Sequence, residues 1–249
     1  MTASPAAGTK IYPDPPGGSP TDLNIILTVT ERRRESTSGE SVFLRKPAGF
    51  EFDPGDWLDI RFPTAELAVG RTYSFASSPT EADLRITYKR GISSFKKALQ
   101  VVRPGDTLLV TQTGSNGFLL DHSRPAILIA GGVGVAPFRS MIKEAIDYGD
   151  RPSISLLYID RTDEDFIFRD ELDRWARESP SLRVTYVATR REGRLSPARL
   201  RAFTAETPAA AESLYYVAGP PAMVTSSEAL LTELGISQHR VRSDRFDGY

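Results

Sequence analysis

The first half of the chain alternates apolar and polar positions in short segments. These segments occupy residues 24–30, 41–46, 56–62, 72–78, 84–90 and 107–112. The tripeptide Pro-Gly-Asp stands between segments twice, at 54–56 and 104–106, where proline and glycine supply the backbone angles of a tight turn. Alternation with a period of two at this spacing predicts an antiparallel β-barrel or sandwich, with one helix inserted at 94–101.

After Arg124 the pattern changes. Apolar segments that suit buried strands now alternate with amphipathic segments that suit helices. The strand segments are 126–130, 153–159, 183–188 and 214–219, and the helical segments are 138–149, 168–178 and 222–235. This order predicts βαβ units and a parallel sheet covered by helices on both faces.

The two patterns divide the chain into domains. We predict a β-rich domain at 21–122 and an α/β domain at 123–249, with the boundary near 121–125. Residues 1–20 are rich in Pro, Gly, Ala and Ser, which bury too little apolar surface to offset the entropy of the chain. We therefore predict a flexible tail there.

Composition narrows the possible chemistry. The 31 basic and 32 acidic residues leave a net charge of −1, so no overall field favours nucleic acid or an anionic membrane. The absence of cysteine excludes an iron–sulfur cluster or thiolate site in this chain, and two histidines disfavour a histidine metal site. We expect no bound metal, so that redox chemistry would need an organic cofactor. We find neither an apolar run long enough to span a membrane nor a secretory leader, and expect a cytoplasmic protein.

A glycine-rich turn opens the second pattern. It lies between the apolar segment 126–130 and a helix predicted from Phe138, and after Gly131 it consists of Gly132, Val133, Gly134, Val135, Ala136 and Pro137. Glycine lets a backbone approach a pyrophosphate closely, and a helix N-terminus offers unpaired N–H groups to it. The spacing differs from the usual Gly-x-Gly-x-x-Gly, so a tight turn without a ligand is the alternative interpretation.

The segment 71–79 combines several groups that suit a phosphate and a conjugated ring. Arg71 is a charge-assisted donor to phosphate, Tyr73 offers an amphipathic ring, and Ser74 offers a short hydroxyl donor. An ordinary half-buried strand would show the same alternation.

Together with Gly219-Pro220-Pro221-Ala222-Met223 near the end, these motifs occur in an order that resembles the ferredoxin–NADP(+) reductase superfamily. The resemblance covers about 23–249. It implies a two-domain fold, in which an antiparallel β-barrel that binds FAD precedes a Rossmann-like α/β domain that binds a pyridine dinucleotide. The residues that it implies at the end of the dinucleotide site are Gly219, Pro220 and Met223.

The resemblance also implies how the flavin is held. Arg71 would contact the FAD pyrophosphate, Tyr73 would flank the isoalloxazine, and Ser74 would place its hydroxyl near the flavin N5, with Thr72 between them. A second flavin segment would include Thr87, Tyr88, Lys89, Ile92, Ser93 and Ser94. A strand followed by a capped helix is the alternative interpretation of that segment.

The choice between NADP and NAD depends on whether cations meet the 2′-phosphate. Thr189, Arg190 and Arg194 resemble bacterial NADP-dependent members, and Arg161 follows the preceding strand in a similar way. We favour NADP over NAD because arginine matches phosphate oxygens well, although arginines of this kind often belong to solvated surfaces.

Two positions refine the resemblance. Many members have a cysteine beside the nicotinamide where this chain has Ala218, which excludes thiol chemistry there. The chain ends in Tyr249, and several reductases of the family end in an aromatic residue that stacks on the flavin and yields to the nicotinamide. Ser74 and Tyr249 are thus the candidate catalytic residues, although a terminal tyrosine is often only a frayed end.

The expected function is hydride transfer between NADPH and bound FAD, with electrons passed to a separate carrier such as ferredoxin or flavodoxin. A basic surface could dock an acidic carrier and would include Arg32, Arg33, Arg34, Lys89, Arg90, Lys96 and Lys97. The alternatives are the reductase component of an oxygenase and a regulatory module that binds flavin without turnover.

Overall fold

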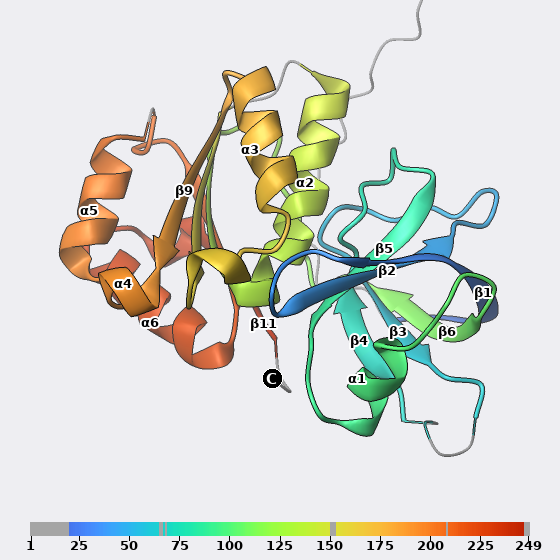
Figure 1. The fold of residues 1–249 in the computed structure, drawn as a ribbon. Coiled ribbons are helices and arrows are strands. Elements are labelled where there is room, and N and C mark those ends of the chain that lie inside the picture. The colour runs from blue at the N-terminus through green and yellow to red at the C-terminus, as the bar shows by residue number, and fades with distance from the viewer. Residues whose placement is uncertain (1–19, 65–66, 68, 150–152, 208, 247–249) are drawn as a thin grey trace, which may run out of the picture.

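Six antiparallel strands form the first sheet of the computed structural model, which describes residues 20–64, 67, 69–149, 153–207 and 209–246 (Figure 1). The strands are β1 Thr21–Arg34, β2 Gly39–Arg45, β3 Trp57–Arg61, β4 Arg71–Ser74, β5 Asp83–Lys89 and β6 Thr107–Gly114. Their order is β4-β3-β6-β1-β2-β5, and every neighbouring pair is antiparallel. The tail predicted at 1–20 lies outside the described residues except for Pro20.

The sheet curls until its edge strands meet. β4 and β5 lie in contact, and directly after β4 the Ala76 amide donates a hydrogen bond to the Arg85 carbonyl of β5 at 2.7 Å. Alternate side chains point inward, as the sequence predicted: Leu58 and Ile60 of β3 are fully buried. The result is the nearly closed antiparallel barrel that the resemblance implied.

One short helix, α1 Ser94–Leu99, follows β5. The Ser93 hydroxyl caps it by accepting a hydrogen bond from the Lys96 amide at 3.3 Å, and Phe95 and Leu99 are its buried residues. The helix ends two residues before the predicted Val101, which is 68% exposed. Because Val101 has no apolar surface to cover, another half-turn of helix would gain nothing from packing.

Five parallel strands form the second sheet. They are β7 Ala126–Gly131, β8 Ile154–Asp160, β9 Leu182–Ala188, β10 Leu214–Gly219 and β11 Val241–Arg245, in the order β11-β10-β7-β8-β9. The helices between them are α2 Val135–Tyr148, α3 Arg169–Glu178, α4 Thr189–Glu192, α5 Pro197–Ala205 and α6 Pro221–Glu233. The 3-10 turns are η2 Gly132–Gly134, η3 Asp163–Asp165 and η4 Gln238–Arg240.

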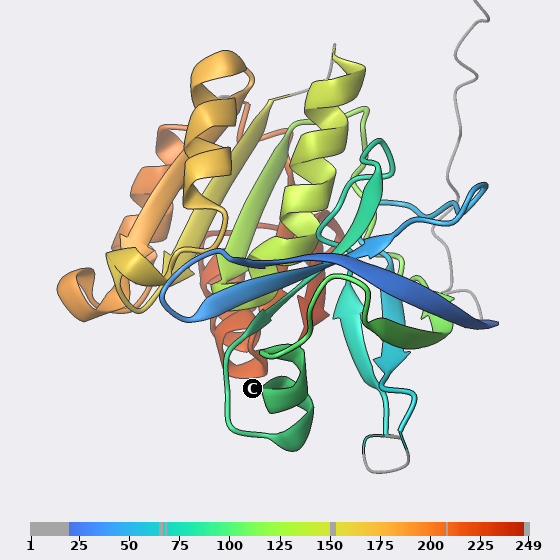
Figure 2. The ribbon, with the colours of Figure 1, turned by 45° about the vertical axis from the view of Figure 1, so that its right-hand side comes forward.

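Helices cover both faces of this sheet, as the sequence predicted. Residues of α2 and α3, including Phe138 and Trp175, pack with one set of strand side chains, and residues of α5 and α6, including Phe203 and Leu231, pack with the alternate set. Both views show α2 as the helix of this sheet that lies next to the barrel (Figures 1 and 2). The parallel α/β part of the prediction is confirmed.

Several elements differ from the sequence prediction. The helix α2 begins at Val135 rather than Phe138, because a proline such as Pro137 is tolerated within the first helical turn, where its missing N–H is not needed. The short elements α4, α5 and β11 were not predicted. Within the described part of the chain, no helix is both long and apolar enough to cross a membrane.

The two sheets are joined by the connection between Gly114 and Ala126. We propose that they are separate domains, with the division in this connection at about the predicted 121–125. Phe118 and Leu120 of the connection pack into the core of the α/β part, together with Ala76 from the barrel. The interface between the two parts therefore has an apolar component of its own.

Buried charges also cross this interface. The guanidinium of Arg85 in β5 donates to Glu171 of α3 at 3.0 Å and to Glu35 at 2.5 Å. The guanidinium of Arg139 in α2 donates to Glu171 at 2.7 Å and to Glu81 at 2.7 Å. We call these five residues the interdomain charge cluster. The side chains of Arg85 and Arg139 are 1% and 2% exposed, whereas those of Glu171 and Glu81 are partly exposed, so the cluster ties the barrel to the α/β part through two buried cations.

Candidate functional site

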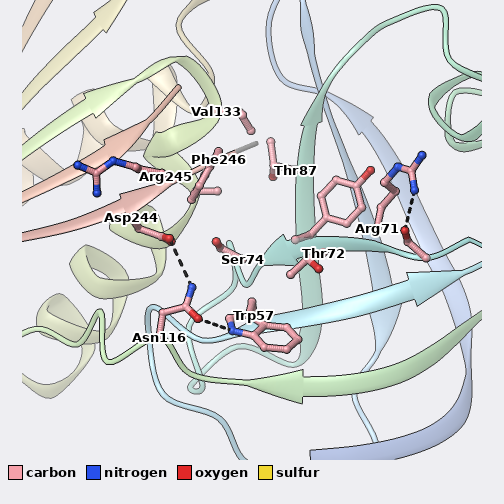
Figure 3. Close-up of a pocket in the computed structure, with 13 residues that line it drawn as sticks. Trp57, Arg71, Thr72, Ser74, Thr87, Asn116, Val133, Asp244, Arg245 and Phe246 are labelled. Atoms are coloured by element: carbon pink, nitrogen blue, oxygen red, sulfur yellow. Dashed lines mark hydrogen bonds between the residues drawn. The ribbon is translucent and has the colours of Figure 1, made fainter. Parts of the chain in front are cut away.

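A cavity of about 400 Å³ opens between the barrel and the second sheet. That volume falls within the roughly 300–1,000 Å³ of typical small-molecule sites. Its walls come from β3, β4, β5, the turn η2, the start of α2 and the end of β11: Trp57, Gly70, Arg71, Thr72, Tyr73, Ser74, Thr87, Asn116, Val133, Ala136, Asp244, Arg245 and Phe246. Figure 3 shows side chains of β4 on one side of this cavity and those of the C-terminal strand on the other.

Strand β4 contributes the four residues of the Arg-Thr-Tyr-Ser motif. It pairs with β3, which places Ser74 opposite Trp57 and Tyr73 opposite Leu58. The Ser74 hydroxyl has no hydrogen-bond partner among the described residues, and Figure 3 shows Ser74 beside the open centre of the cavity. It is therefore available to a ligand.

Tyr73 and Arg71 form the end of the cavity near helix α1. The Tyr73 ring stacks with the ring of Phe95 at 6.5 Å, and the Arg71 guanidinium lies 5.8 Å from the centre of the same ring. Burial raises the pKa of Tyr73, so its phenol stays protonated and can donate a hydrogen bond. Arg71 is exposed, and its one hydrogen bond among the described residues goes to the Gly70 carbonyl at 2.8 Å.

The residues of the second flavin segment that the resemblance predicted lie in different places: at the cavity, in the barrel core and at the start of α1. Thr87 lines the cavity, whereas the Tyr88 side chain lies in the barrel core and donates to Glu40 at 2.8 Å. Ile92 is 89% exposed, and Ser93 and Ser94 stand at the start of α1 beside Phe95. Among these side chains, only that of Thr87 faces the cavity.

The glycine-rich turn and the Gly-Pro-Pro motif pack directly on each other. A Cβ atom on Gly134 would lie 2.2 Å from the Ala218 carbonyl oxygen, and one on Gly131 would lie 2.2 Å from the Met223 methyl carbon. Gly132 has φ +55 and Gly219 has φ +148, values that favour glycine. Val133 and Ala136 of this turn line the same cavity as Ser74.

Gly134→Ala is expected to damage this junction. Gly134 has φ −59, which suits alanine, so the effect would come only from the clash with the backbone of β10. We expect a cost of about 2–3 kcal/mol, seen as a fall in Tm of about 5–10 °C and a loss of dinucleotide affinity. Gly91→Ala is the matched control, because its Cβ would meet only the flexible Lys96 side chain. Equal Tm values for the two variants would contradict the close packing.

The arginines predicted to select NADP lie at the ends of neighbouring strands. The Arg190 amide donates to the Arg161 carbonyl at 2.9 Å, so the segments after β8 and β9 are adjacent. Arg161, Arg190 and Arg194 are exposed, and no ion pair holds their guanidinium groups among the described residues. Arg191, by contrast, pairs with Asp163 and with Glu192. Thr189 begins α4 beside them.

The C-terminal strand adds cavity residues that the sequence analysis missed. Asn116 accepts a hydrogen bond from the Trp57 indole at 3.1 Å and donates to Asp244 at 3.5 Å (Figure 3). Burial raises the pKa of Asp244, while the hydrogen bond from Asn116 opposes that effect. Phe246 also lines the cavity, and its amide donates to the Gly219 carbonyl at 3.0 Å. Tyr249 lies outside the described residues, so its gating role stays a prediction.

The sequence contained only an indirect sign that Asp244 belongs to the cavity. Asp244 lies at the carboxyl end of a parallel strand, and such ends converge on ligand sites in open α/β sheets. The segment 241–245 is mostly polar, however, and has no alternation that would have marked it as a strand. Without the strand, nothing in the sequence placed Asp244 next to Asn116.

The cavity fits the flavin and dinucleotide that the resemblance implied. The barrel side has an aromatic wall, an exposed cation and a hydroxyl without a partner among the described residues. The other side has Val133 and Ala136, around the start of α2, where a helix N-terminus suits a phosphate. Within the described residues, no group of three or more His, Asp or Glu side chains is placed to hold a metal ion.

Comparison with known proteins gives the family. Residues 128–229 match the oxidoreductase NAD-binding domain. The chain is 32% identical to ferredoxin–NADP reductase B of Sorangium cellulosum over 80% of this chain and 86% of that protein. It is 25% identical to the flavohemoprotein of Bacillus subtilis over 88% of this chain, and 28% identical to the reductase component of propane 2-monooxygenase of Rhodococcus jostii over 81%. It spans only 58% and 57% of the length of those two proteins.

A solved structure supports the fold independently. The ferredoxin NADP+ reductase from Neisseria gonorrhoeae, with bound FAD and NADP, superposes with a TM-score of 0.77 at 17% sequence identity, covering 89% of this chain and 98% of that one. The two-domain architecture and the identity to the Sorangium reductase lead to the same result. The chain belongs to the ferredoxin–NADP(+) reductase superfamily of oxidoreductases.

Proposed function

We propose that the protein is a flavoenzyme that takes hydride from a reduced nicotinamide dinucleotide onto bound FAD and passes electrons to a separate acceptor. One observation carries the proposal: the Arg-Thr-Tyr-Ser strand and the glycine-rich turn open into a single cavity. Ser74 from the first and Val133 and Ala136 from the second line that cavity. A nicotinamide ring and a flavin ring bound by these two elements would meet inside it, as hydride transfer requires.

The barrel residues would hold and orient the FAD. Arg71 would pair with its pyrophosphate, and Tyr73 would lie against the isoalloxazine. Ser74 would donate its hydroxyl hydrogen to the flavin N5, which would orient the ring and make N5 a better hydride acceptor. When bound, FAD supplies a hydride acceptor that can also release electrons one at a time.

The residues of the second sheet would position the dinucleotide. The turn from Gly132 to Pro137 would receive the pyrophosphate at the start of α2. Gly219, Pro220 and Met223 would bound the nicotinamide end, because they pack on that turn. Asp244 is a half-buried carboxyl at the same cavity, where burial raises its pKa, and it would offer a hydrogen-bonding group beside the reacting rings. We propose further that Tyr249 covers the flavin until the nicotinamide displaces it.

We infer that NADPH is preferred over NADH. Arg161, Arg190 and Arg194 are exposed near adjacent strand ends and form no ion pair within the described part of the chain, which suits a 2′-phosphate. Arg190→Ala and Arg194→Ala should each raise the KM for NADPH about tenfold, because each removes a charge-assisted hydrogen bond, and should leave the KM for NADH unchanged. Arg177→Ala, at an exposed site on α3, is the matched control. Equal effects on both nucleotides would remove this inference.

For the acceptor, we propose a small carrier protein such as ferredoxin or flavodoxin, supported by the likeness to a ferredoxin–NADP reductase over most of both chains. The second candidate is the reductase component of an oxygenase, which the propane monooxygenase relative favours. Because the chain has no cysteine, the metal centre would then reside in another polypeptide.

Two measurements test these proposals. Anaerobic titration of the purified holoprotein with NADPH should bleach the flavin absorbance. A flavin that stays oxidised would favour a regulatory module without turnover. Steady-state rates with ferredoxin, flavodoxin and free flavin as acceptors then separate the candidates, and activity confined to free flavin would exclude the carrier proteins.

A further inference from the structure

Two neighbouring side chains of helix α2 donate hydrogen bonds to two neighbouring carbonyls of the barrel. The Arg139 guanidinium donates to the Ala76 carbonyl at 2.7 Å. The Ser140 hydroxyl donates to the Ser77 carbonyl at 2.6 Å. All four residues are at most 2% exposed, so water does not compete for these bonds. We call the two contacts the α2 clamp.

The α2 clamp continues the cavity wall on the side of the second sheet. Ala136 lines the cavity and precedes Arg139 and Ser140 by three and four residues in α2. Residues at these spacings lie on one face of a helix. The face of α2 that forms part of the cavity wall therefore also carries the clamp, one turn after the glycine-rich turn.

The α2 clamp is equally near the cavity on the barrel side. Ser74 lines the cavity at the end of β4, and the carbonyls of Ala76 and Ser77 follow it by two and three residues. The Ala76 amide donates to the Arg85 carbonyl at 2.7 Å, and the Ser77 hydroxyl accepts from the Arg85 amide at 2.9 Å. The segment after β4 is thus held by β5 on one side and by α2 on the other.

We propose that Arg139 and Ser140 are positioning residues for hydride transfer, and that the α2 clamp sets the spacing between the flavin site and the nicotinamide site. This assignment rests on the proposed function, because it takes β4 as part of the first site and the glycine-rich turn as part of the second. A misplacement of about 1 Å between reacting groups can cost roughly a hundredfold in rate. The clamp can therefore control the rate although neither of its side chains lines the cavity.

Ser140→Ala tests the clamp with the smallest change to the fold. It leaves the buried Ser77 carbonyl without this donor, so Tm should fall by about 2–4 °C. In stopped-flow mixing, flavin reduction at saturating NADPH should slow about tenfold, while the dissociation constant for NADPH stays within twofold. Amide hydrogen exchange in residues 75–78 of the oxidised holoprotein should become faster, which reports the loosened clamp without any turnover.

Ser213→Ala is the matched control. Ser213 is also fully buried, and its hydroxyl also donates to a backbone carbonyl, that of Ala209 at 2.9 Å. Both residues lie in the turn before β10 and neither lines the cavity. This variant should lower Tm by a similar amount, with wild-type exchange in residues 75–78 and a wild-type rate of flavin reduction.

Arg139→Lys tests the other half of the clamp. It keeps the positive charge but removes the planar guanidinium that bonds to Ala76, Glu81 and Glu171 at once. We expect flavin reduction to slow more than in Ser140→Ala, again with the dissociation constant for NADPH within twofold.

A purely structural clamp predicts a different result. Ser140→Ala would then resemble Ser213→Ala, with a lower Tm and a wild-type rate of flavin reduction. That result, or a slower rate that arises wholly from weaker NADPH binding, overturns the proposal. Wild-type protein separates this outcome from failure of the proposed function: if NADPH does not reduce its flavin, the function itself is wrong, whatever the variants do.

Discussion

Ser74→Ala is expected to slow flavin reduction by NADPH about a hundredfold while leaving the flavin bound. The substitution removes one hydroxyl that faces the cavity and has no partner among the described residues, so the barrel loses no internal hydrogen bond. A preorganised hydrogen-bond donor lost at the reacting atom typically costs this much in rate. Stopped-flow mixing of oxidised holoprotein with NADPH measures it directly.

Two further variants make the Ser74 result specific. Ser74→Thr keeps the hydroxyl and should recover part of the rate. Ser226→Ala removes an exposed hydroxyl of α6 that bonds only within its helix, to the Ala222 carbonyl, and should reduce flavin at the wild-type rate. A wild-type reduction rate in Ser74→Ala would rule out the role assigned to this hydroxyl.

Glu171→Gln should destabilise the protein by about 3 kcal/mol at pH 7. Glu171 is the shared acceptor of Arg85 and Arg139, and each guanidinium is almost fully buried. Removing its charge leaves two buried cations with one carboxylate each, Glu35 and Glu81, and breaking a buried pair typically costs 3–5 kcal/mol. Urea unfolding followed by fluorescence gives the free energy. Glu178→Gln, at the exposed end of α3, is the control and should change it little.

The lowered pKa of the Glu171 carboxyl predicts how the stability of the protein depends on pH. Burial alone would raise the pKa of Glu171, but the hydrogen bonds and charges of Arg139 and Arg85 outweigh it and lower that pKa from 4.5 to about 2. A lowered pKa contributes stability that is complete above the unfolded value and is lost as pH falls from about 4.5 toward about 2. That contribution is roughly 3 kcal/mol. The difference between wild type and Glu171→Gln should therefore shrink between pH 5 and pH 3, and a constant difference would contradict the assignment.

The strong periodic segments of the chain could be read correctly without a structure. The barrel strands show alternation because one side of each faces a closed apolar core, as Leu58 and Ile60 do. The strands of the second sheet are continuously apolar because helices cover both faces. The ends of the helices were predicted less accurately than the helices themselves. Helix α2 starts at Val135, and this start depends on how the glycine-rich turn packs against Ala218, which the local sequence does not encode.

Partnerships across the two sheets could not be predicted. Asn116 and Asp244 are 128 residues apart, and Arg85 and Glu171 are 86 apart. Each side chain alone suits a solvated surface as well as a site. Lys89 is a clear example: its sequence context pointed to the flavin, and its ammonium lies on Asp160 beside the glycine-rich turn.

The sequence by itself determined the two kinds of sheet, the order of the domains and the three motifs of the family, because periodicity and turn chemistry are local properties of the chain. Only the tertiary structure decided which residues share the cavity, that the C-terminal strand brings Asp244 and Phe246 to it, and that buried charges join the domains. The physical reason is that pairing of distant strands and burial of charge depend on long-range packing. That packing forms only when the whole chain has folded.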